Sequence, residues 1–133
     1  MKQFTEHDIK DKERLERMIQ VEAYEIHRSQ TSRKYRTYND IEKVVRQGKI
    51  AELYMIENYN FREADKKYHD LISPNGNYIE VKAYSVYDSN APYVQKDLQR
   101  YRKENWNISK WYILFSVWDG VYTYLETINI EKI

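Results

Sequence analysis

Asp70, Glu80 and Lys82 have the residue types and the spacing that phosphoryl-transfer chemistry needs. Glu80 and Lys82 lie two positions apart in an alternating run that predicts a strand over residues 77–85, so both side chains project from one face. Asp70 lies ten positions before Glu80 in a predicted strand over residues 67–73, and the turn around Asn75 and Gly76 places it roughly opposite Glu80. We therefore expect a pair of carboxylates with an ammonium group on the same side.

The expected pairing of Asp70 with Glu80 favours a bound cation. Two carboxylates at the separation of a cross-strand pair repel each other unless a cation lies between them, and Mg²⁺ prefers oxygen ligands. An ammonium group beside such a cation orients or deprotonates a water molecule, or neutralises charge while a phosphodiester is attacked. The residues thus predict a magnesium site at Asp70 and Glu80, with Lys82 next to it.

An exposed cross-strand salt-bridge cluster is the alternative interpretation of the same three residues. The chain contains 21 Asp and Glu residues, so acid-x-Lys triplets occur readily, and Asp8-Ile9-Lys10 and Asp65-Lys66-Lys67 are two others. Only Glu80-Val81-Lys82 lies in a predicted strand with an acidic residue on its hairpin partner. On spacing alone, a site and a salt-bridge cluster remain equally open.

Glu52 is a fourth candidate because it lies on the apolar side of a predicted helix. Asn39, with Glu42 three positions later, is typical of an N-cap and capping box, and this helix is expected to run to about residue 59. A carboxylate on the buried side is costly unless it is paired or associated with a metal ion. Pairing with Lys49 or with a backbone donor is the alternative to a role in the site. The apolar arc that contains Glu52 is defined by Val45, Met55, Ile56 and Tyr59.

The elements that position these residues follow the order α, α, β, β, α, β, β, which indicates an α/β (α+β) fold. The first helix is expected over residues 5–29 and the third from Pro92 to about Trp106. A nearly continuous apolar run over residues 111–118 predicts a strand buried on both faces, followed by an Asp119-Gly120 turn and a strand over residues 121–128. The apolar spacing of the first helix is carried by Leu15, Ile19, Glu22 and Ile26.

Length and composition indicate one domain over residues 1–133, with a helical and basic extension over 1–38 and a core over 39–133. The chain is 41% hydrophobic and 32% charged, and it has no apolar run near the roughly 20 residues that span a bilayer. It contains no cysteine, which excludes disulfides and thiolate metal sites. With a polar N-terminus as well, we expect a soluble, cytoplasmic protein.

A basic stretch between Arg28 and Arg36 contains no acidic residue and is a candidate contact for phosphate groups. Arg33, Lys34 and Arg36 lie in it, together with interleaved tyrosines, which suits a clamp on the backbone of DNA. A solvated connection between two helices is the equally open alternative.

The arrangement of these motifs resembles the PD-(D/E)XK, or restriction-endonuclease-like, superfamily. An acidic helix, then Asp70, then Glu80-Val81-Lys82 on the next strand, then a helix and a buried strand carry the resemblance over residues 39–128. It implies an αβββαβ-type core around a mixed sheet. It also implies that Asp70, Glu80 and the carbonyl of Val81 hold Mg²⁺, that Lys82 positions the attacking water, and that Glu52 contributes to the metal site directly or through water.

Two details of the resemblance concern other residues. His69 stands where the motif has proline, a residue that many members of the superfamily also lack. We expect the side chain of His69 to face away from Asp70. Gln95, Leu98 and Tyr101 on the third helix are similar to the Gln and Tyr that some exonuclease-type branches place beside the lysine. Gln95 is therefore a candidate site member, whereas Leu98 and Tyr101 also suit the core.

The resemblance implies a Mg²⁺-dependent DNA endonuclease, bacterial or phage-encoded, that leaves 5′-phosphate and 3′-hydroxyl ends. Mn²⁺ is expected to substitute for Mg²⁺, and no organic cofactor is expected. A homodimer is expected because one active site cuts one strand. A Holliday-junction resolvase or a DNA-processing nuclease of the same fold is the first alternative. A DNA-binding protein without catalysis is the second, because fold does not establish function.

Overall fold

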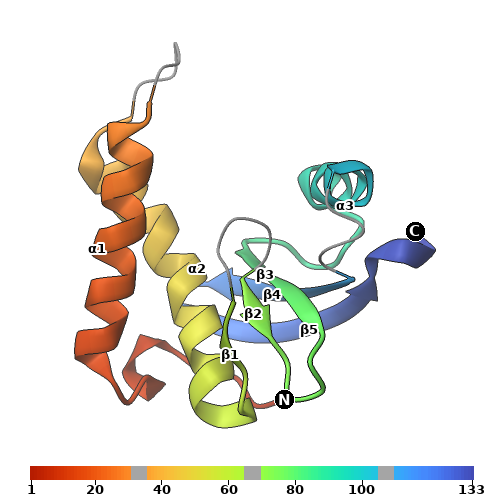
Figure 1. Cartoon of the computed structure of the whole chain (residues 1–133), viewed down its shortest axis with the longest axis horizontal. Coiled ribbons are helices and arrows are strands. Elements are labelled where there is room, and N and C mark those ends of the chain that lie inside the picture. The colour runs from red at the N-terminus through yellow and green to blue at the C-terminus, as the bar shows by residue number, and fades with distance from the viewer. Residues whose placement is uncertain (31–35, 65–69, 105–109) are drawn as a thin grey trace.

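A five-stranded mixed sheet with helices on both faces forms the body of the protein in the computed structural model, which describes residues 1–30, 36–64, 70–104 and 110–133 (Figure 1). This architecture confirms the expected α+β class. Among the described residues, no helix combines the length and the apolar character that crossing a membrane requires. The helices are α1 (Lys12–Arg28), α2 (Tyr38–Tyr59) and α3 (Pro92–Glu104), and the strands are β1 (Arg62–Glu63), β2 (Leu71–Ile72), β3 (Tyr78–Tyr84), β4 (Trp111–Trp118) and β5 (Val121–Asn129).

The strands lie in the order β1-β2-β3-β4-β5. β1 with β2, β2 with β3, and β4 with β5 are antiparallel pairs, whereas β3 and β4 are parallel. Parallel neighbours need a crossover connection, and α3 lies in the segment that supplies it. β4 lies between β3 and β5, so it is a central strand, which agrees with its nearly continuous burial.

The two faces of the sheet carry separate cores. Ile79, Val81 and Ala83 of β3 pack in one cluster with buried residues of α1 and α2. On the other face, Leu98 and Tyr101 of α3 pack with buried residues of β4. Figure 1 accordingly shows α1 and α2 on one side of the sheet and α3 on the other. The predicted alternation of β3, with Glu80 and Lys82 on the face opposite Ile79, Val81 and Ala83, is confirmed by this division.

The first two helices begin at residues other than those predicted. A short 3-10 turn, Glu6–Asp8, precedes α1, because the chain is extended at Ile9, whose side chain is buried. Helix α2 is capped by Thr37, whose hydroxyl accepts the amide N–H of Asp40 at 3.2 Å, so the predicted cap at Asn39 is wrong by two positions.

The hairpin between β2 and β3 closes as its turn residues predict. Gly76 adopts a φ of +84°, and Ser73 and Asn77 close the loop through a backbone hydrogen bond of 2.9 Å. The register pairs Leu71 with Ile79. β2 is shorter than predicted, since only residues 71–72 are paired and residues 65–69 lie outside the described part of the chain. The two-residue strand β1, which pairs with β2, was not predicted because so short a strand has no alternating pattern.

Candidate active site

Asp70 lies opposite Glu80, directly before the first residue of β2, as the hairpin predicts. The backbone N–H of Asp70 donates to the carbonyl of Ile79 at 3.2 Å, and Ile79 is the register partner of the next residue, Leu71. The Oδ2 atom of Asp70 accepts the backbone N–H of Val81 at 2.9 Å. A side chain thus takes an acceptor role at the edge of β3 where, among the described residues, the pairing with β2 stops. This hydrogen bond fixes the carboxylate against β3.

The carbonyl of Val81 faces the same edge as the Asp70 carboxylate. In a strand, the N–H and C=O groups of one residue point to the same side, and residues two apart share that side. Val81 donates its N–H toward Asp70, and the carbonyl of Ala83 accepts from Nε2 of Gln47, on α2, at 2.7 Å. The Val81 carbonyl therefore lies between these two contacts, on the side of the pocket described below.

Glu80 is a buried carboxyl group with a strongly raised pKa. Only 5% of the surface of Glu80 is exposed. Burial, followed by the negative charge of Asp70, raises the pKa of Glu80 to about 8, against the opposing effect of Lys82. This burial of Glu80 does not suit an exposed salt-bridge cluster, which is the alternative interpretation of these residues.

Lys82 lies on the same face as Glu80 and rests against phenol groups. Its Nζ atom is 5.6 Å from the centre of the Tyr101 ring. Burial alone would lower the pKa of Lys82, but Tyr101, Tyr84 and the charge of Asp70 raise it above the usual value. Among the described residues, no carboxylate lies within 4.0 Å of the ammonium group. Lys82 is thus a cation held by its surroundings and not by an ion pair.

Tyr101, and not Gln95, is the residue of α3 beside Lys82. The Nε2 atom of Gln95 donates to the carbonyl of Ser89 at 2.6 Å, so this amide stabilises the loop before α3. A role of Gln95 in the candidate site stays a prediction. Leu98 is buried in the core on this face, as expected.

Glu52 is buried, as its position in the apolar arc predicts, and it is paired with Lys49. The residue is 6% exposed, and its two carboxylate oxygens lie 3.3 and 3.2 Å from the Nζ atom of Lys49. Burial, and then the charge of Asp70, raises the pKa of Glu52 to about 8, while Lys49 acts to lower it. The pairing with Lys49 that was the alternative interpretation is present, and the charge of Asp70 also reaches this carboxylate.

Lys49 connects the site to the first helix. Only 2% of Lys49 is exposed, and its Nζ atom also lies 3.2 Å from Oε1 of Glu22 on α1. Burial would lower the pKa of Lys49, but the charges of Glu52, Glu22 and Asp70 raise it above the usual value. Sequence reasoning did not assign Glu22 to the site, although its place among the apolar positions of the first helix was a usable signal.

The groups around Asp70 border a pocket of about 270 Å³ at the free edge of β3. Asp70, Lys82 and Glu52 belong to its wall, whereas Glu80 is not among the lining residues. Among the described residues, the pairing of β2 with β3 stops next to Asp70, so groups from both faces of the sheet reach this edge. The wall is completed by Glu22, Ile26, Val44, Val45, Gln47, Gly48, Val81, Ala83 and Tyr84.

The donor set fits a magnesium ion that keeps part of its water shell. Within the described ranges, no three His, Cys, Asp or Glu side chains form a metal-binding group. Mg²⁺, however, is usually held by one or two carboxylates while several waters remain bound. Asp70 and Glu80, whose repulsion raises the pKa of Glu80, together with the Val81 carbonyl, supply such a set. Because both oxygens of Glu52 contact Lys49, Glu52 fits an outer role through water better than a direct ligand role.

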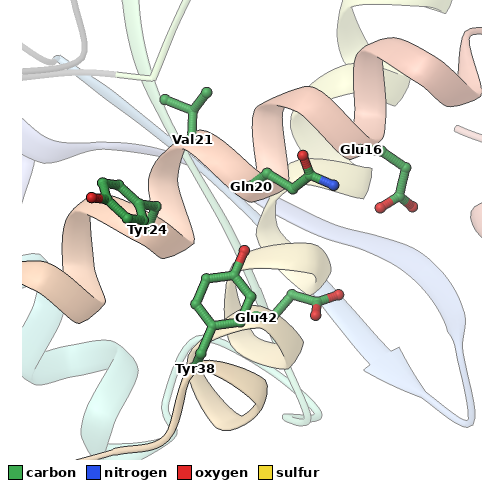
Figure 2. Close-up of a pocket in the computed structure, with 6 residues that line it drawn as sticks. All are labelled: Glu16, Gln20, Val21, Tyr24, Tyr38 and Glu42. Carbon is green, nitrogen blue, oxygen red and sulfur yellow. The ribbon is translucent and has the colours of Figure 1, made fainter.

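A larger hollow between α1 and α2, of about 600 Å³, lacks the chemistry of the first pocket. Its two acids, Glu16 and Glu42, are both bound by Arg46, at 2.7 and 2.9 Å. The hydrogen bond from Arg46 lowers the pKa of Glu16. These two carboxylates are neutralised by Arg46, so they do not form a repelling pair. Figure 2 shows the lining residues Glu16, Gln20, Val21 and Tyr24 on α1 and Tyr38 and Glu42 on α2.

The predicted phosphate contacts are only partly within the described residues. Arg33, Lys34 and also His69 lie outside them. The backbone of Arg36 is tied to the side chain of Gln30, which accepts its N–H at 2.8 Å and donates to its carbonyl at 3.0 Å. The role of the basic stretch stays a prediction.

No protein-family model matches this chain, and a search of curated proteins found no match either.

Proposed function

We propose that this protein is a Mg²⁺-dependent nuclease that hydrolyses phosphodiester bonds of DNA at the pocket beside Asp70. One observation carries the proposal: Asp70, Lys82 of β3 and Glu52 of α2 line the same pocket. The charge of Asp70 acts on these two side chains and on Glu80 and Lys49. Buried carboxylates with raised pKa values, gathered with lysines at a pocket, are typical of functional sites.

The order of elements supports the finer fold assignment. α2, β1, β2, β3, α3 and β4 follow one another as α, β, β, β, α, β, which is the αβββαβ order expected for a restriction-endonuclease-like core. Helix α1 lies outside this order and forms the proposed N-terminal extension. β1 is part of this agreement although the sequence pattern did not predict it.

Each residue of the pocket has a distinct task in the proposed reaction. Asp70 and Glu80, with the Val81 carbonyl, would hold the metal ion. Lys82 carries its proton at neutral pH, so it stabilises the negative charge that develops on the attacked phosphate and orients the water by donating to it. Glu52, held by Lys49, accepts a hydrogen bond from that water or from one beside it. Mg²⁺, when bound, lowers the pKa of a coordinated water and withdraws charge from the phosphate.

The test is a cleavage assay with four DNA substrates: plasmid, linear duplex, single strand and four-way junction, each with Mg²⁺ or with EDTA. We expect cleavage that needs Mg²⁺ or Mn²⁺ and leaves 5′-phosphate ends. Preference for the junction would favour a resolvase. Binding of DNA with no cleavage of any substrate would favour the DNA-binding protein without catalysis and would refute the nuclease.

Metal binding has a readout that does not depend on catalysis. A ligand that binds only the folded state raises the melting temperature by mass action, by about 2.7 kcal/mol of stability at 100 times its Kd. Mg²⁺ should therefore raise the melting temperature of the wild type, and less so that of Asp70→Asn. Asp88→Asn, which changes an exposed aspartate outside the pocket, is the matched control and should respond like the wild type.

A further inference from the structure

A stacked pair of exposed aromatic rings lies at the end of β3, beyond the candidate active site. Tyr87 is 84% exposed and Trp118 is 44% exposed, and their ring centres are 5.2 Å apart with planes inclined by 26°. One face of the Tyr87 ring is covered by Trp118, so its high exposure means that the other face is open. Most exposed apolar side chains are scattered singly, whereas adjacent ones mark contact surfaces.

The loop that carries Tyr87 is held on both sides of this residue. On one side, Val86 is buried, and the Oγ atom of Ser85 donates to the carbonyl of Val117 at 2.8 Å. On the other side, Oδ1 of Asp88 accepts the N–H of Asn90 at 2.8 Å, and the carbonyl of Ser89 accepts from Gln95. The open ring is therefore presented by an ordered backbone, which reduces the entropy that a ligand must overcome.

The aromatic pair is close to the pocket along the same strand. Tyr87 lies five positions after Lys82, a span of at most about 18 Å even when the chain is fully extended. Tyr84, between them, belongs to the pocket wall. A nucleic-acid strand whose phosphate lies at Lys82 can therefore reach the open face of Tyr87 within the roughly 4–16 nucleotides that single-strand binding sites cover.

The charges beside the pair suit a base and not a phosphate. Asp88 follows Tyr87 directly and Asp119 follows Trp118 directly, and both are acidic. Phosphate groups are disfavoured near two carboxylates, whereas the flat face of a base stacks on an aromatic ring regardless of its sequence. In an intact duplex the faces of the bases are already stacked on each other, so only an unpaired base is free to take this position.

We propose that Tyr87, backed by Trp118, is a stacking subsite for an unpaired base, and that the substrate of the neighbouring site is DNA with a single-stranded segment next to the scissile bond. The substrate class rests on the proposed nuclease function, whereas the stacking subsite is testable without cleavage. A second copy of the chain or another protein is the rival occupant of this surface.

The experiment measures binding of a labelled 16-nucleotide oligothymidine, and of a duplex of the same length, by fluorescence anisotropy in EDTA. Tyr87→Ala should weaken binding of the single strand by about 5- to 150-fold, the loss of one base-stacking contact, and leave the duplex nearly unchanged. Tyr87→Phe should retain the wild-type affinity because the ring remains. Tyr24→Ala, which removes a tyrosine on α1 that is 61% exposed, is the matched control.

Trp118 supplies a direct reading of the stack. Oligothymidine should quench part of the tryptophan emission of the wild type, and Trp118→Phe should lose that part of the response. Equal affinities of wild type and Tyr87→Ala for the single strand would overturn the subsite, even if the protein cleaves DNA. Tyr87-dependent binding with no cleavage under any condition would overturn the nuclease and leave the subsite standing. A change in oligomeric state of Tyr87→Ala in sedimentation, with DNA binding intact, would assign the surface to a second copy and overturn the proposal.

Discussion

Lys49, which is buried, and Lys82, which is half-buried, are two cations of the same pocket region, yet their surroundings differ in kind. Lys49 lies between carboxylates of two helices, with Glu22 and Glu52 both 3.2 Å from its Nζ atom. Lys82 has Tyr101 and Tyr84 as neighbours, and among the described residues it has no ion pair. In both cases burial opposes the charge, and other groups raise the pKa above the usual value.

This difference separates a cation that stabilises the fold from one that is available to a ligand. The two carboxylates satisfy the charge of Lys49, so a phosphate would have to displace them. The phenol of Tyr101 accepts a hydrogen bond from Lys82, but a neutral phenol attracts an ammonium group less strongly than a carboxylate does, so an incoming phosphate oxygen can compete for its donors. We therefore assign Lys49 to holding α1, α2 and Glu52 together, and Lys82 to the substrate.

The largest effect is expected for Lys49→Met. Lys49 acts to lower the pKa of Glu52, so its removal makes ionisation of this buried carboxyl costlier. Removing one partner of a buried ion pair typically costs about 3–5 kcal/mol. Urea unfolding at pH 8 should show this loss, and at pH 5 the loss should be smaller because Glu52 is then protonated. Lys43→Met, at an exposed lysine of the same helix, should change the free energy of unfolding by less than about 0.5 kcal/mol.

The converse is expected for Lys82→Met. Loss of a donor that acts in the transition state costs about 2.7–4 kcal/mol, so cleavage should fall about 10²- to 10³-fold. The free energy of unfolding should change by less than about 1.5 kcal/mol, because the substitution nearly conserves volume and leaves no unpaired carboxylate behind. Single-turnover rates and urea unfolding measure the two quantities. Undiminished Mg²⁺-dependent cleavage by this variant would remove Lys82 from the proposed reaction.

A smaller effect, on the pH dependence of stability, tests the charge of Asp70, which acts on both lysines. The pKa values of Glu52 and Glu80 rise from 4.5 to about 8 on folding, so between these values the folded state holds protons that the unfolded chain has released. The free energy of unfolding contributed by these groups is thus greatest below pH 4.5 and is lost as the pH rises to about 8. Asp70→Asn removes a charge that raises both values, so stability should fall less steeply with pH. A slope equal to that of the wild type would contradict this assignment.

The local parts of this site were predictable from the sequence, and the parts made by packing were not. The opposition of Asp70 and Glu80 and the shared face of Glu80 and Lys82 follow from a two-residue alternation and a turn with Gly76, all within 13 residues. These relations depend on backbone geometry alone. For the same reason the bounds of β4 were predicted correctly, since a strand buried on both faces has a continuous apolar run.

The contacts of Lys49 and Lys82 depend instead on how helices pack on the sheet. Glu22 meets Lys49 only because α1 packs against α2, and Tyr101 meets Lys82 only because α3 covers the second face. A helical period gives the buried side of a helix but not its partner. The cap at Thr37 was missed because Asn39 is also a good capping residue. The residue types do not show at which of the two positions the backbone changes from extended to helical.

The smallest effect, Glu22→Gln, tests whether Lys49 is held mainly within α2. Lys49 is 2% exposed, but the side chain of Glu22 is 36% exposed. The Glu22 carboxylate therefore kept part of its hydration on folding, whereas Glu52, at 8% side-chain exposure, lost most of its own. An ion pair with a partly solvated partner is worth about 0.2–1 kcal/mol.

We expect Glu22→Gln to lower the free energy of unfolding by about that amount and to leave cleavage unchanged, because Glu52 still neutralises Lys49. Glu25→Gln, at an exposed position of α1, is the matched control for the loss of one negative charge. A loss as large as that of Lys49→Met would show that Glu22 is the main partner of Lys49, and a loss of cleavage without a loss of stability would place Glu22, and with it α1, in the catalytic site.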